Sequence, residues 1–346
     1  MTNPARDRAL RVVATARSYC AHDGPHQAIV RDAGIELVLA AEDAPRDADA
    51  LADLARDADG MILGLDHCDE RVFAAAPRLR VVARFGVGTD SVDLEAARAH
   101  GVTVTNTPGA NTVAVAELTL ALVLALARDL PAAIASTRSG TPRRGRGWEL
   151  RGKTLGLVGL GRIGQAVAER AAAFGMRVIG FDPYVPEVPG VTRVALDELW
   201  PQADVISLHL GLSDATRHMI DASVLARCKP SAVLVNTARG GLIDEQALAH
   251  ALRSGALAGA AADAFEHEPP VGNPLLELPN FLPTPHMGAA THEAVLAMGV
   301  SAAEDVVAVL RGAPPKHVVV APGAPRAGAP RAPNTPSAQG APRRES

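Results

Sequence analysis

Short runs of consecutive apolar residues, many of them β-branched, alternate along most of the chain with alanine-rich segments of helical character. Continuous apolar runs of this kind are typical of strands that are buried on both faces, as in parallel sheets. The first predicted strands lie at residues 10–16, 35–40, 61–64, 79–84 and 102–107. The alternation predicts parallel sheets covered by helices.

A long apolar helix is predicted to follow these strands. It begins after the cap-like pair Asn111–Thr112 and stops before Pro131, and a polar loop rich in glycine and arginine follows over residues 136–152. A second series then begins, with strands at 154–159, 176–181, 204–210, 231–237, 257–262 and 281–284 and helices at 162–174 and 291–311. The pattern by itself places two α/β domains one after the other, the second of dinucleotide-binding type.

Composition and charge leave several classes of function without support. A length of 346 residues, of which 48% are hydrophobic, is sufficient for two domains with separate cores. A net charge of −4 gives no electrostatic signature for nucleic acid or an anionic membrane. The three cysteines are far apart, which suits a reducing compartment and provides no metal-binding pair.

Neither the start of the sequence nor its longest apolar run suggests membrane targeting. The start, MTNPARDRAL, is polar, and the run over 113–127 is interrupted by Glu117 and short for a bilayer. We therefore expect a cytoplasmic protein without a membrane or nucleic-acid partner. The tail over 321–346 consists mainly of Ala, Pro, Gly and Arg, and this composition predicts disorder.

The segment LGLVGLGRIGQAV carries a G-x-G-x-x-G pattern at Gly159, Gly161 and Gly164, directly after a predicted strand and at the start of a predicted helix. Such glycines permit a tight turn, close approach to a pyrophosphate, and close helix–strand packing. The helix N-terminus adds free N–H groups and partial positive charge. Asp182 ends the next strand, where a carboxylate would bind the adenosine ribose and disfavour a 2′-phosphate. The alternative is a turn-forming Asp182 before Pro183.

Three polar residues follow three successive predicted strands of the second series: Arg239, Glu268 and His286. Ligands on doubly wound sheets lie beyond the carboxyl ends of the strands. Arg can hold a carboxylate and a carbonyl oxygen through paired donors, His can exchange the alcohol proton near neutral pH, and Glu favours the imidazolium and fixes the ring. Separately, each has a structural explanation. Together they predict a hydride-transfer site. The other histidines have no spacing that suggests a metal, although His209 could face an adenine pocket.

These motifs resemble the NAD-dependent D-2-hydroxyacid dehydrogenase family, in particular its D-3-phosphoglycerate dehydrogenase branch. The resemblance covers roughly residues 10–320 and rests on RFGVGTDSVD (84–93), NTPGANTVAVAEL (106–118), GKTLGLVGLGRIG (152–164), VNTARGGLIDE (235–245) and TPHMGAAT (284–291). It implies two Rossmann-like doubly wound parallel-sheet α/β domains. The substrate domain is then discontinuous, formed by 1–105 and 292–320, and the NAD-binding domain is inserted over 106–291. This arrangement returns the last helix to the first domain.

The resemblance also implies residue roles. Arg239, Glu268 and His286 match the family's catalytic residues. The implied substrate contacts are the backbone at Val87 and Gly88, Arg239, and Arg84 for a remote anion. The implied NAD contacts are Thr112, Gly159, Gly161, Arg162, Ile163, Gly164, Asp182, His209, Thr216, Thr237, Ala238, Asp263 and Gly288. No metal is implied. Members of the family usually pair through the cofactor domain and the long connecting helix, so we expect a homodimer.

The sequence departs from the family pattern in places. The family's His-x-Pro at one strand end is His209-Leu210-Gly211 here, and Ala262 and Ala264 stand where larger residues are common. Neither departure involves the catalytic residues. The regulatory domain of some phosphoglycerate enzymes has no counterpart in this sequence, so serine feedback is not expected.

We therefore expect an NAD-dependent oxidoreductase that interconverts a small D-2-hydroxy acid, 3-phosphoglycerate-like in bearing a phosphate or phosphonate, and its 2-oxo acid. Formate is disfavoured because formate dehydrogenases of this fold have Gln in place of Glu268. The alternatives are a phosphonate alcohol dehydrogenase of the same fold and an NAD-sensing, corepressor-like binding protein.

Overall fold

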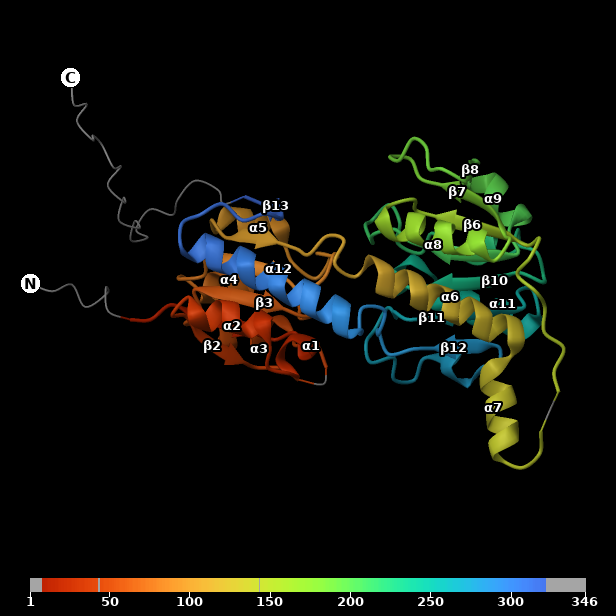
Figure 1. Ribbon diagram of the computed structural model, residues 1–346, viewed down its shortest axis with the longest axis horizontal. Helices are drawn as coiled ribbons and strands as arrows, with labels where there is room; N and C mark the ends of the chain where they lie inside the picture. The colour runs from red at the N-terminus through yellow and green to blue at the C-terminus, as the bar shows by residue number, and fades with distance from the viewer. Residues whose placement is uncertain (1–7, 43, 143, 322–346) are drawn as a thin grey trace, which may run out of the picture.

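Two separate β-sheets divide the chain into two lobes (Figure 1). The computed structural model describes residues 8–42, 44–142 and 144–321. The predicted disorder over 321–346 therefore falls, except for Ala321, outside the described residues. Within the described residues, no helix is both long enough and apolar enough to cross a membrane.

The sheet of the first lobe has the order β13-β5-β4-β3-β1-β2. All neighbouring strands are parallel except β13, which runs antiparallel to β5. The sequence pattern did not predict β13. The strands are β1 (Arg11–Ala14), β2 (Glu36–Leu39), β3 (Gly60–Leu63), β4 (Val81–Arg84), β5 (Thr103–Thr105) and β13 (Val318–Val320).

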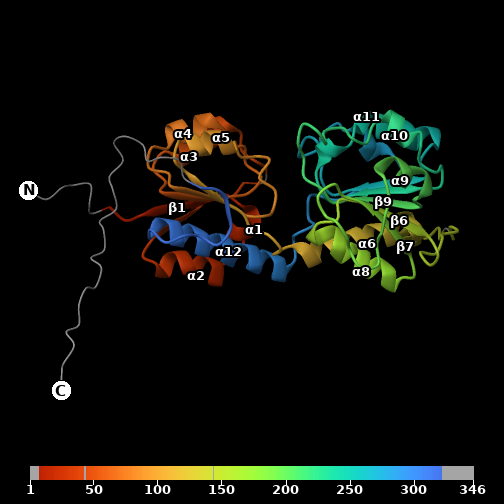
Figure 2. The ribbon, with the colours of Figure 1, turned by 90° about the horizontal axis from the view of Figure 1, so that it is seen from above.

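Helices cover both faces of this first sheet (Figure 2). One face is packed by α3 (Ala48–Ala55), α4 (Glu70–Ala75) and α5 (Leu94–Ala99), and the other by α1 (Arg17–Cys20), α2 (Pro25–Asp32) and α12 (His292–Leu310). The helix α12 comes from the far end of the sequence. It buries Met298, Ala302 and Val306 against this sheet, so the order of elements along the chain is not their order in space.

The sheet of the second lobe has the order β12-β11-β10-β9-β6-β7-β8, and every neighbouring pair is parallel. Only the short strand β8 is absent from the sequence prediction, because Thr192 and Arg193 are exposed and polar. The strands are β6 (Thr154–Val158), β7 (Arg177–Phe181), β8 (Thr192–Arg193), β9 (Val205–Leu208), β10 (Val233–Asn236), β11 (Gly259–Ala262) and β12 (Phe281–Pro283).

Helices cover both faces of the second sheet as well. On one face lie α6 (Thr112–Arg128) and α8 (Arg162–Ala173), and on the other α9 (Leu196–Gln202), α10 (Ala222–Leu225) and α11 (Glu245–Ser254). Short 3₁₀ turns occupy Gly240–Leu242 and Pro274–Glu277. The fold class predicted from the sequence, two doubly wound α/β units with parallel sheets, is confirmed.

The strand order reverses once in each sheet, between β1 and β3 in the first lobe and between β6 and β9 in the second. Ligands of doubly wound sheets bind beyond the strand ends at such reversals. The crevices expected to hold ligands therefore lie after β1 and β3 in one lobe and after β6 and β9 in the other.

The helix α7 (Leu130–Arg138) differs from the sequence prediction, which ended the long helix before Pro131, placed a loop from residue 136 and predicted no second helix between them. Asp129 breaks the chain direction in the left-handed conformation, with φ 47°. Pro131 then stands in the first turn of α7, where its missing N–H leaves no helical hydrogen bond unmade. This helix buries none of its residues, and it stands away from the body of the second lobe (Figure 1).

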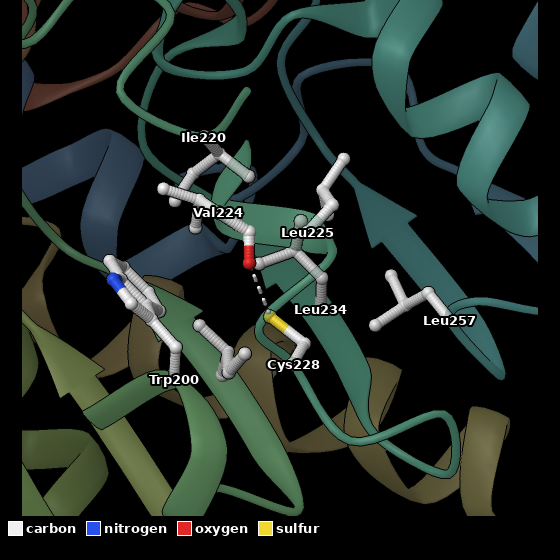
Figure 3. A pocket seen from close by; sticks show the side chains of 8 residues that line it. Trp200, Ile220, Val224, Leu225, Cys228, Leu234 and Leu257 are labelled. Carbon is white, nitrogen blue, oxygen red and sulfur yellow. Dashed lines mark hydrogen bonds between the residues drawn. The ribbon is translucent and has the colours of Figure 1, made fainter. Parts of the chain in front are cut away.

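A small, closely packed apolar pocket lies within the second lobe, between the strands β9 and β10 and the helices α9 and α10 (Figure 3). Trp200, Ile220 and Leu257 are among its lining residues. The thiol of Cys228 donates a hydrogen bond to the carbonyl of Val224 at 3.4 Å, as the dashed line marks. Burial raises the pKa of this thiol to about 11, so it is protonated and belongs to the core.

Candidate active site

Three neighbouring strands of the second lobe bring Arg239, Glu268 and His286 to one edge of the sheet. Arg239 follows β10, Glu268 follows β11 and His286 follows β12, and these strands are adjacent. The segments are also in contact, because a Cβ added at Gly240 would lie 1.9 Å from the backbone carbon of Phe265. The backbone N–H of Phe265 in turn donates to Glu268 Oε1 at 3.1 Å.

His286 and Glu268 form a direct pair. His286 Nδ1 lies 2.8 Å and 2.9 Å from the two carboxylate oxygens of Glu268. An ionised carboxylate only accepts hydrogen bonds, so Nδ1 carries the proton and Nε2 is left to exchange one. His286 has a left-handed backbone with φ 53°, a conformation that persists in a non-glycine residue only where surrounding contacts impose it.

Asp263 supplies those contacts to the loop that carries His286. Its Oδ1 accepts from Thr284 Oγ1 at 2.6 Å and from the Met287 N–H at 2.8 Å, and its Oδ2 accepts from the Gly288 N–H at 2.7 Å. Asp263 is buried at the end of β11. Family resemblance assigned Asp263 and Gly288 to the cofactor; in this structure their contact with each other holds the His286 loop.

Arg239 reaches across to the first lobe. Its Nε donates to both oxygens of Asp90, at 2.8 Å and 3.0 Å, and its Nη1 donates to the carbonyl of Ala238 at 2.8 Å. A Cβ added at Gly88 would lie only 1.4 Å from Arg239 Nη2, so the guanidinium presses on the backbone of the 86–88 turn. The carbonyl of Val87 accepts from the Asn106 side chain at 2.8 Å, which ties the same turn to the chain crossing between the lobes.

Arg84, at the end of β4, contacts the start of this turn, since a Cβ added at Gly86 would lie 3.1 Å from its Nη1. It is 5% exposed, and its Nη1 donates to the carbonyl of Phe85. Among the described residues its buried Nε has no hydrogen-bond partner. Burial and the charge of Arg239 lower the pKa of Arg84 to about 10, although Asp90 and Asp66 act in the opposite direction. The 86–88 turn is therefore flanked by two guanidinium groups, one from each lobe.

The three glycines of the glycine-rich loop differ in what surrounds them. A Cβ at Gly159, where φ is 97°, would lie 2.4 Å from the carbonyl oxygen of His209, and one at Gly164 would lie 2.2 Å from that of Gly159. A Cβ at Gly161 would meet nothing within 4 Å. Gly159 and Gly164 thus serve the packing of β6, β9 and α8, whereas no contact within the described chain requires a glycine at 161. Gly161 caps α8, and no side chain accepts from that helix start.

Asp182 uses its carboxylate to hold two loops. Oδ2 accepts from the Leu160 N–H at 2.8 Å, and Oδ1 accepts from the N–H groups of Tyr184 and Val185 at 2.8 Å and 3.1 Å. Partial burial raises the pKa of this carboxyl, but the backbone donors and Arg193 outweigh burial and lower it. The turn-forming role of Asp182 is thus present, and it also fixes the glycine-rich loop.

His209 stands where β9 ends, against Gly159. Its Nε2 lies 2.8 Å from Ser207 Oγ. Burial lowers the pKa of His209 to about 4, so the ring is neutral at physiological pH. A neutral histidine whose backbone and Cβ pack against the glycine-rich loop is compatible with a place beside a bound adenine.

The remaining residues expected at the cofactor lie along the same edge of the second sheet. Thr112 opens α6, and Thr237 follows β10, where its hydroxyl lies 2.8 Å from that of Thr119. The Ala238 N–H donates to Asn236 Oδ1 at 3.0 Å. Thr216 donates to the Gly211 carbonyl at 3.0 Å within its own loop. Arg162 and Ile163 form the first turn of α8. Their roles toward a cofactor stay predictions.

Sequence reasoning missed the partners that hold the predicted residues in place, above all Asp90, Asn106 and Thr284. Asp90 belongs to the RFGVGTDSVD segment, but no local pattern links it to Arg239, which is 149 residues away. In the part of the chain that the structure describes, no cluster of three or more His, Cys, Asp or Glu side chains is arranged to hold a metal.

The comparison with known proteins identifies the family. Residues 120–288 match the model of the D-isomer specific 2-hydroxyacid dehydrogenase NAD-binding domain. The TT0316 protein from Thermus thermophilus shares this fold with a TM-score of 0.83 and 41% sequence identity, over 90% of this chain and 100% of that one. The chain belongs to the D-isomer specific 2-hydroxyacid dehydrogenase family.

Two further relatives of this dehydrogenase family member carry functional names. D-3-phosphoglycerate dehydrogenase of Methanocaldococcus jannaschii is 51% identical over 240 residues, which are 67% of this chain and 46% of that protein. The D-lactate dehydrogenase from Aquifex aeolicus, solved with NAD and lactic acid, has a TM-score of 0.79 and 27% identity, over 90% of this chain and 100% of that one. The chain spans about half the length of the curated relatives it matches.

Proposed function

We propose that this chain is an NAD-dependent dehydrogenase that interconverts a small D-2-hydroxy acid and its 2-oxo acid. The observation that carries the proposal is that two side-chain contacts with different chemistry occur after neighbouring strands of the second lobe. One is a guanidinium against a glycine turn, Arg239 on Gly88, and the other is an imidazole held by a carboxylate, His286 on Glu268. The first binds a carboxylate and the second exchanges a proton, as this reaction requires.

The chain's own residues have distinct tasks in the proposed reaction. Arg239 and the backbone at Val87 and Gly88 hold the substrate carboxylate. His286 Nε2 takes the proton of the C2 hydroxyl during oxidation and returns it during reduction. Glu268 keeps the proton of the ring on Nδ1 and stabilises the imidazolium, since its two oxygens lie within 2.9 Å of Nδ1. Bound NAD supplies the hydride acceptor or donor.

The residues around the glycine-rich loop fit NAD. A Cβ at Gly161 would meet no neighbouring part of the chain within 4 Å, and this residue begins α8, where no side chain caps the helix. The N–H groups and dipole of this helix start would attract a pyrophosphate. The Asp182 carboxylate, whose pKa is lowered, is charged at this edge of the loop and would repel a 2′-phosphate. These features favour NAD over NADP.

Arg84 supports a substrate with a second anionic group. The buried guanidinium lies beside Gly86, two residues from the Gly88 that Arg239 contacts, and its Nε has no partner among the described residues. A phosphate or phosphonate at the far end of a short 2-hydroxy acid would supply the missing charge. D-3-phosphoglycerate and phosphonate analogues are the corresponding substrates.

We further propose a cytoplasmic homodimer and the domain division 1–105 with 292–320 against 106–291. Support for the dimer comes from α7, whose Leu130 and Ile134 are 42% and 49% exposed. An open groove between α6 and α8, lined in part by Leu124 and by the exposed Phe174, adds further apolar surface. Exposed apolar side chains gathered on one element are a feature of protein–protein interfaces.

A substrate screen with the purified chain tests the function. NADH oxidation is measured with phosphohydroxypyruvate, hydroxypyruvate, glyoxylate, pyruvate and short phosphonate analogues, and NADPH serves as the cofactor control. Turnover with one 2-oxo acid is the expected result, and the Arg84→Gln variant should lose activity on doubly charged substrates more than on pyruvate. NADH binding without turnover of any substrate would support a nucleotide-sensing protein in place of an enzyme.

A further inference from the structure

We propose that Asp90 is a positioning residue that sets which edge of the Arg239 guanidinium faces the substrate. This inference rests on the proposed function of Arg239 as the carboxylate-binding group. Asp90 lies in the first lobe and Arg239 in the second, so their contact joins the two sides of the site. None of the roles that family resemblance implies includes Asp90.

The hydrogen bonds of Arg239 divide its five N–H donors. Nε gives its single N–H to both oxygens of Asp90, at 2.8 Å and 3.0 Å. Nη1 gives one N–H to the Ala238 carbonyl at 2.8 Å, so one N–H of Nη1 and both of Nη2 are left over. A carboxylate binds a guanidinium either through the Nε–Nη2 edge or through the terminal Nη1–Nη2 edge. Because Asp90 occupies Nε, the terminal edge is the one available.

The backbone of Arg239 is fixed by its own strand end, so the side chain is the variable part. The carbonyl of Arg239 accepts from Asn236 Nδ2 at 2.7 Å. The long aliphatic stem between this anchor and the guanidinium has several rotatable bonds. At the far end of the side chain, Nε donates to Asp90, and Nη2 packs against Gly88, where a Cβ would occupy its place. These two contacts select one rotamer of Arg239.

The exposure of the pair argues against a role mainly in stability. The side chains of Asp90 and Arg239 are 32% and 21% exposed. Ion pairs that remain in contact with water contribute little to folding. Loss of the Asp90 carboxylate is therefore expected to leave the fold intact and to alter the orientation of one catalytic side chain.

The test compares Asp90→Ala and Asp90→Asn with Asp93→Asn. Asp93 lies in the same segment, accepts from the Ala96 N–H at the start of α5, and has no contact with Arg239, so Asp93→Asn removes the same charge nearby. We expect Asp90→Ala to lower kcat/KM for the 2-oxo acid about 10- to 100-fold, mainly by raising KM. Asp90→Asn keeps one acceptor for Nε and should recover part of the loss. The kcat/KM of Asp93→Asn, and the Kd for NADH of all three variants, should remain near the wild-type values.

A double-mutant cycle with Arg239→Lys distinguishes positioning from a general effect. Lysine has no Nε–Nη fork, so Asp90→Ala should cost little further activity in that background. An equal loss in both backgrounds would overturn the proposal, as would wild-type kinetics of Asp90→Ala.

Binding of oxalate, a planar dicarboxylate probe, to the protein–NADH complex separates this inference from the proposed reaction. Weaker oxalate binding in Asp90→Ala supports positioning even if no 2-oxo acid is turned over. Unchanged binding overturns it. Tighter binding would show instead that Asp90 competes with the substrate for Arg239, which also overturns it.

Discussion

His286 Nδ1 lies within hydrogen-bonding distance of both carboxylate oxygens of Glu268, at 2.8 Å and 2.9 Å. The pair fixes both the tautomer and the orientation of the imidazole. An ionised carboxylate only accepts hydrogen bonds, so Nδ1 must carry the proton that it donates to Glu268. Asp263 fixes the loop beneath the same ring through Thr284, Met287 and Gly288. Nε2, the atom proposed to exchange the proton, is therefore held in place by contacts within the protein itself.

Replacement of His286 by Gln tests this proton exchange. General acid–base assistance contributes about 10²- to 10⁴-fold, so kcat should fall by that factor. The Kd for NADH, measured by fluorescence titration, should change less than about twofold, because His286 is not among the residues proposed to bind the nucleotide.

His218→Gln is the matched control for that experiment. His218 also has a positive φ, 50°, and also pairs with a glutamate, Glu266 at 3.0 Å, but it is not part of the proposed catalytic group. Its replacement should leave kcat near wild type. Full turnover by His286→Gln, or an equal loss in both variants, would contradict the proposed role.

The glycine-rich loop leads to a second prediction, in which two glycines of one motif respond differently to alanine. A Cβ at Gly164 would lie 2.2 Å from a backbone oxygen, so Gly164→Ala should destabilise the ligand-free protein by about 1–3 kcal/mol. Gly161→Ala meets no protein atom within 4 Å and should change stability by less than about 1 kcal/mol.

Ligand affinity should show the complementary effect for Gly161. If the space beside it receives the pyrophosphate, Gly161→Ala should raise the Kd for NADH about tenfold or more, which corresponds to about 1.4 kcal/mol. Thermal unfolding and NADH titration of both variants measure the two effects. Unaltered NADH affinity in Gly161→Ala would contradict the assignment of this loop to the cofactor.

The strands were predictable because a strand that is buried on both faces has a continuous apolar sequence. Strands β4 and β10 are examples, and their residues are buried. The elements that were missed lack this signal. Strand β8 is a pair of exposed polar residues, and no residue of α7 is fully buried. Strand β13 is apolar but joins β5 from the opposite end of the chain, and local pattern does not predict such pairing.

The candidate site likewise has residues that the sequence predicts and contacts that it does not. Arg239, Glu268 and His286 are visible in the sequence because each follows a strand and parallel strands end at one edge. The Arg239–Asp90 contact is not, because it depends on how the two lobes face each other. The double use of Asp182 was also not foreseen in full, since its bond to the Leu160 N–H depends on the register between β6 and β7.

His209 gives a third prediction, on the pH dependence of stability. Burial lowers its pKa to about 4 in the folded protein, whereas an exposed histidine has a pKa near 6.5. Between these values the unfolded chain binds the proton more strongly, so stability is lost as pH falls from about 6.5 to about 4. Between pH 7.5 and pH 5 this residue should account for a loss of about 2 kcal/mol.

Urea unfolding followed by tryptophan fluorescence measures this loss in the lobe concerned, because Trp148 and Trp200, the two tryptophans of the chain, both pack in the second lobe. His209→Gln removes the titrating group. Its loss of stability between pH 7.5 and pH 5 should be smaller than that of the wild type by about 2 kcal/mol. Equal losses in the two proteins would show that the titration of His209 does not cause the loss of stability.

The fourth prediction concerns the proposed homodimer and its reliance on α7. Ile134 is 49% exposed on a helix that buries none of its residues. Such a helix gains little from its own lobe, since the stability of helices in proteins comes mainly from packing of an apolar face. A second copy of the chain would supply that packing, and Ile134→Arg would place a charge in the contact.

Light scattering coupled to size-exclusion chromatography checks the state of association. The wild type should have twice the mass of the chain, and Ile134→Arg should shift toward the mass of one chain at micromolar concentration. Tyr184→Arg is the control, because Tyr184 is 92% exposed and lies in the turn after β7, away from α7. If Ile134→Arg keeps the wild-type mass, α7 does not form the contact. A wild type with the mass of one chain would exclude the dimer, and the exposed face of α7 would then need another partner to cover it.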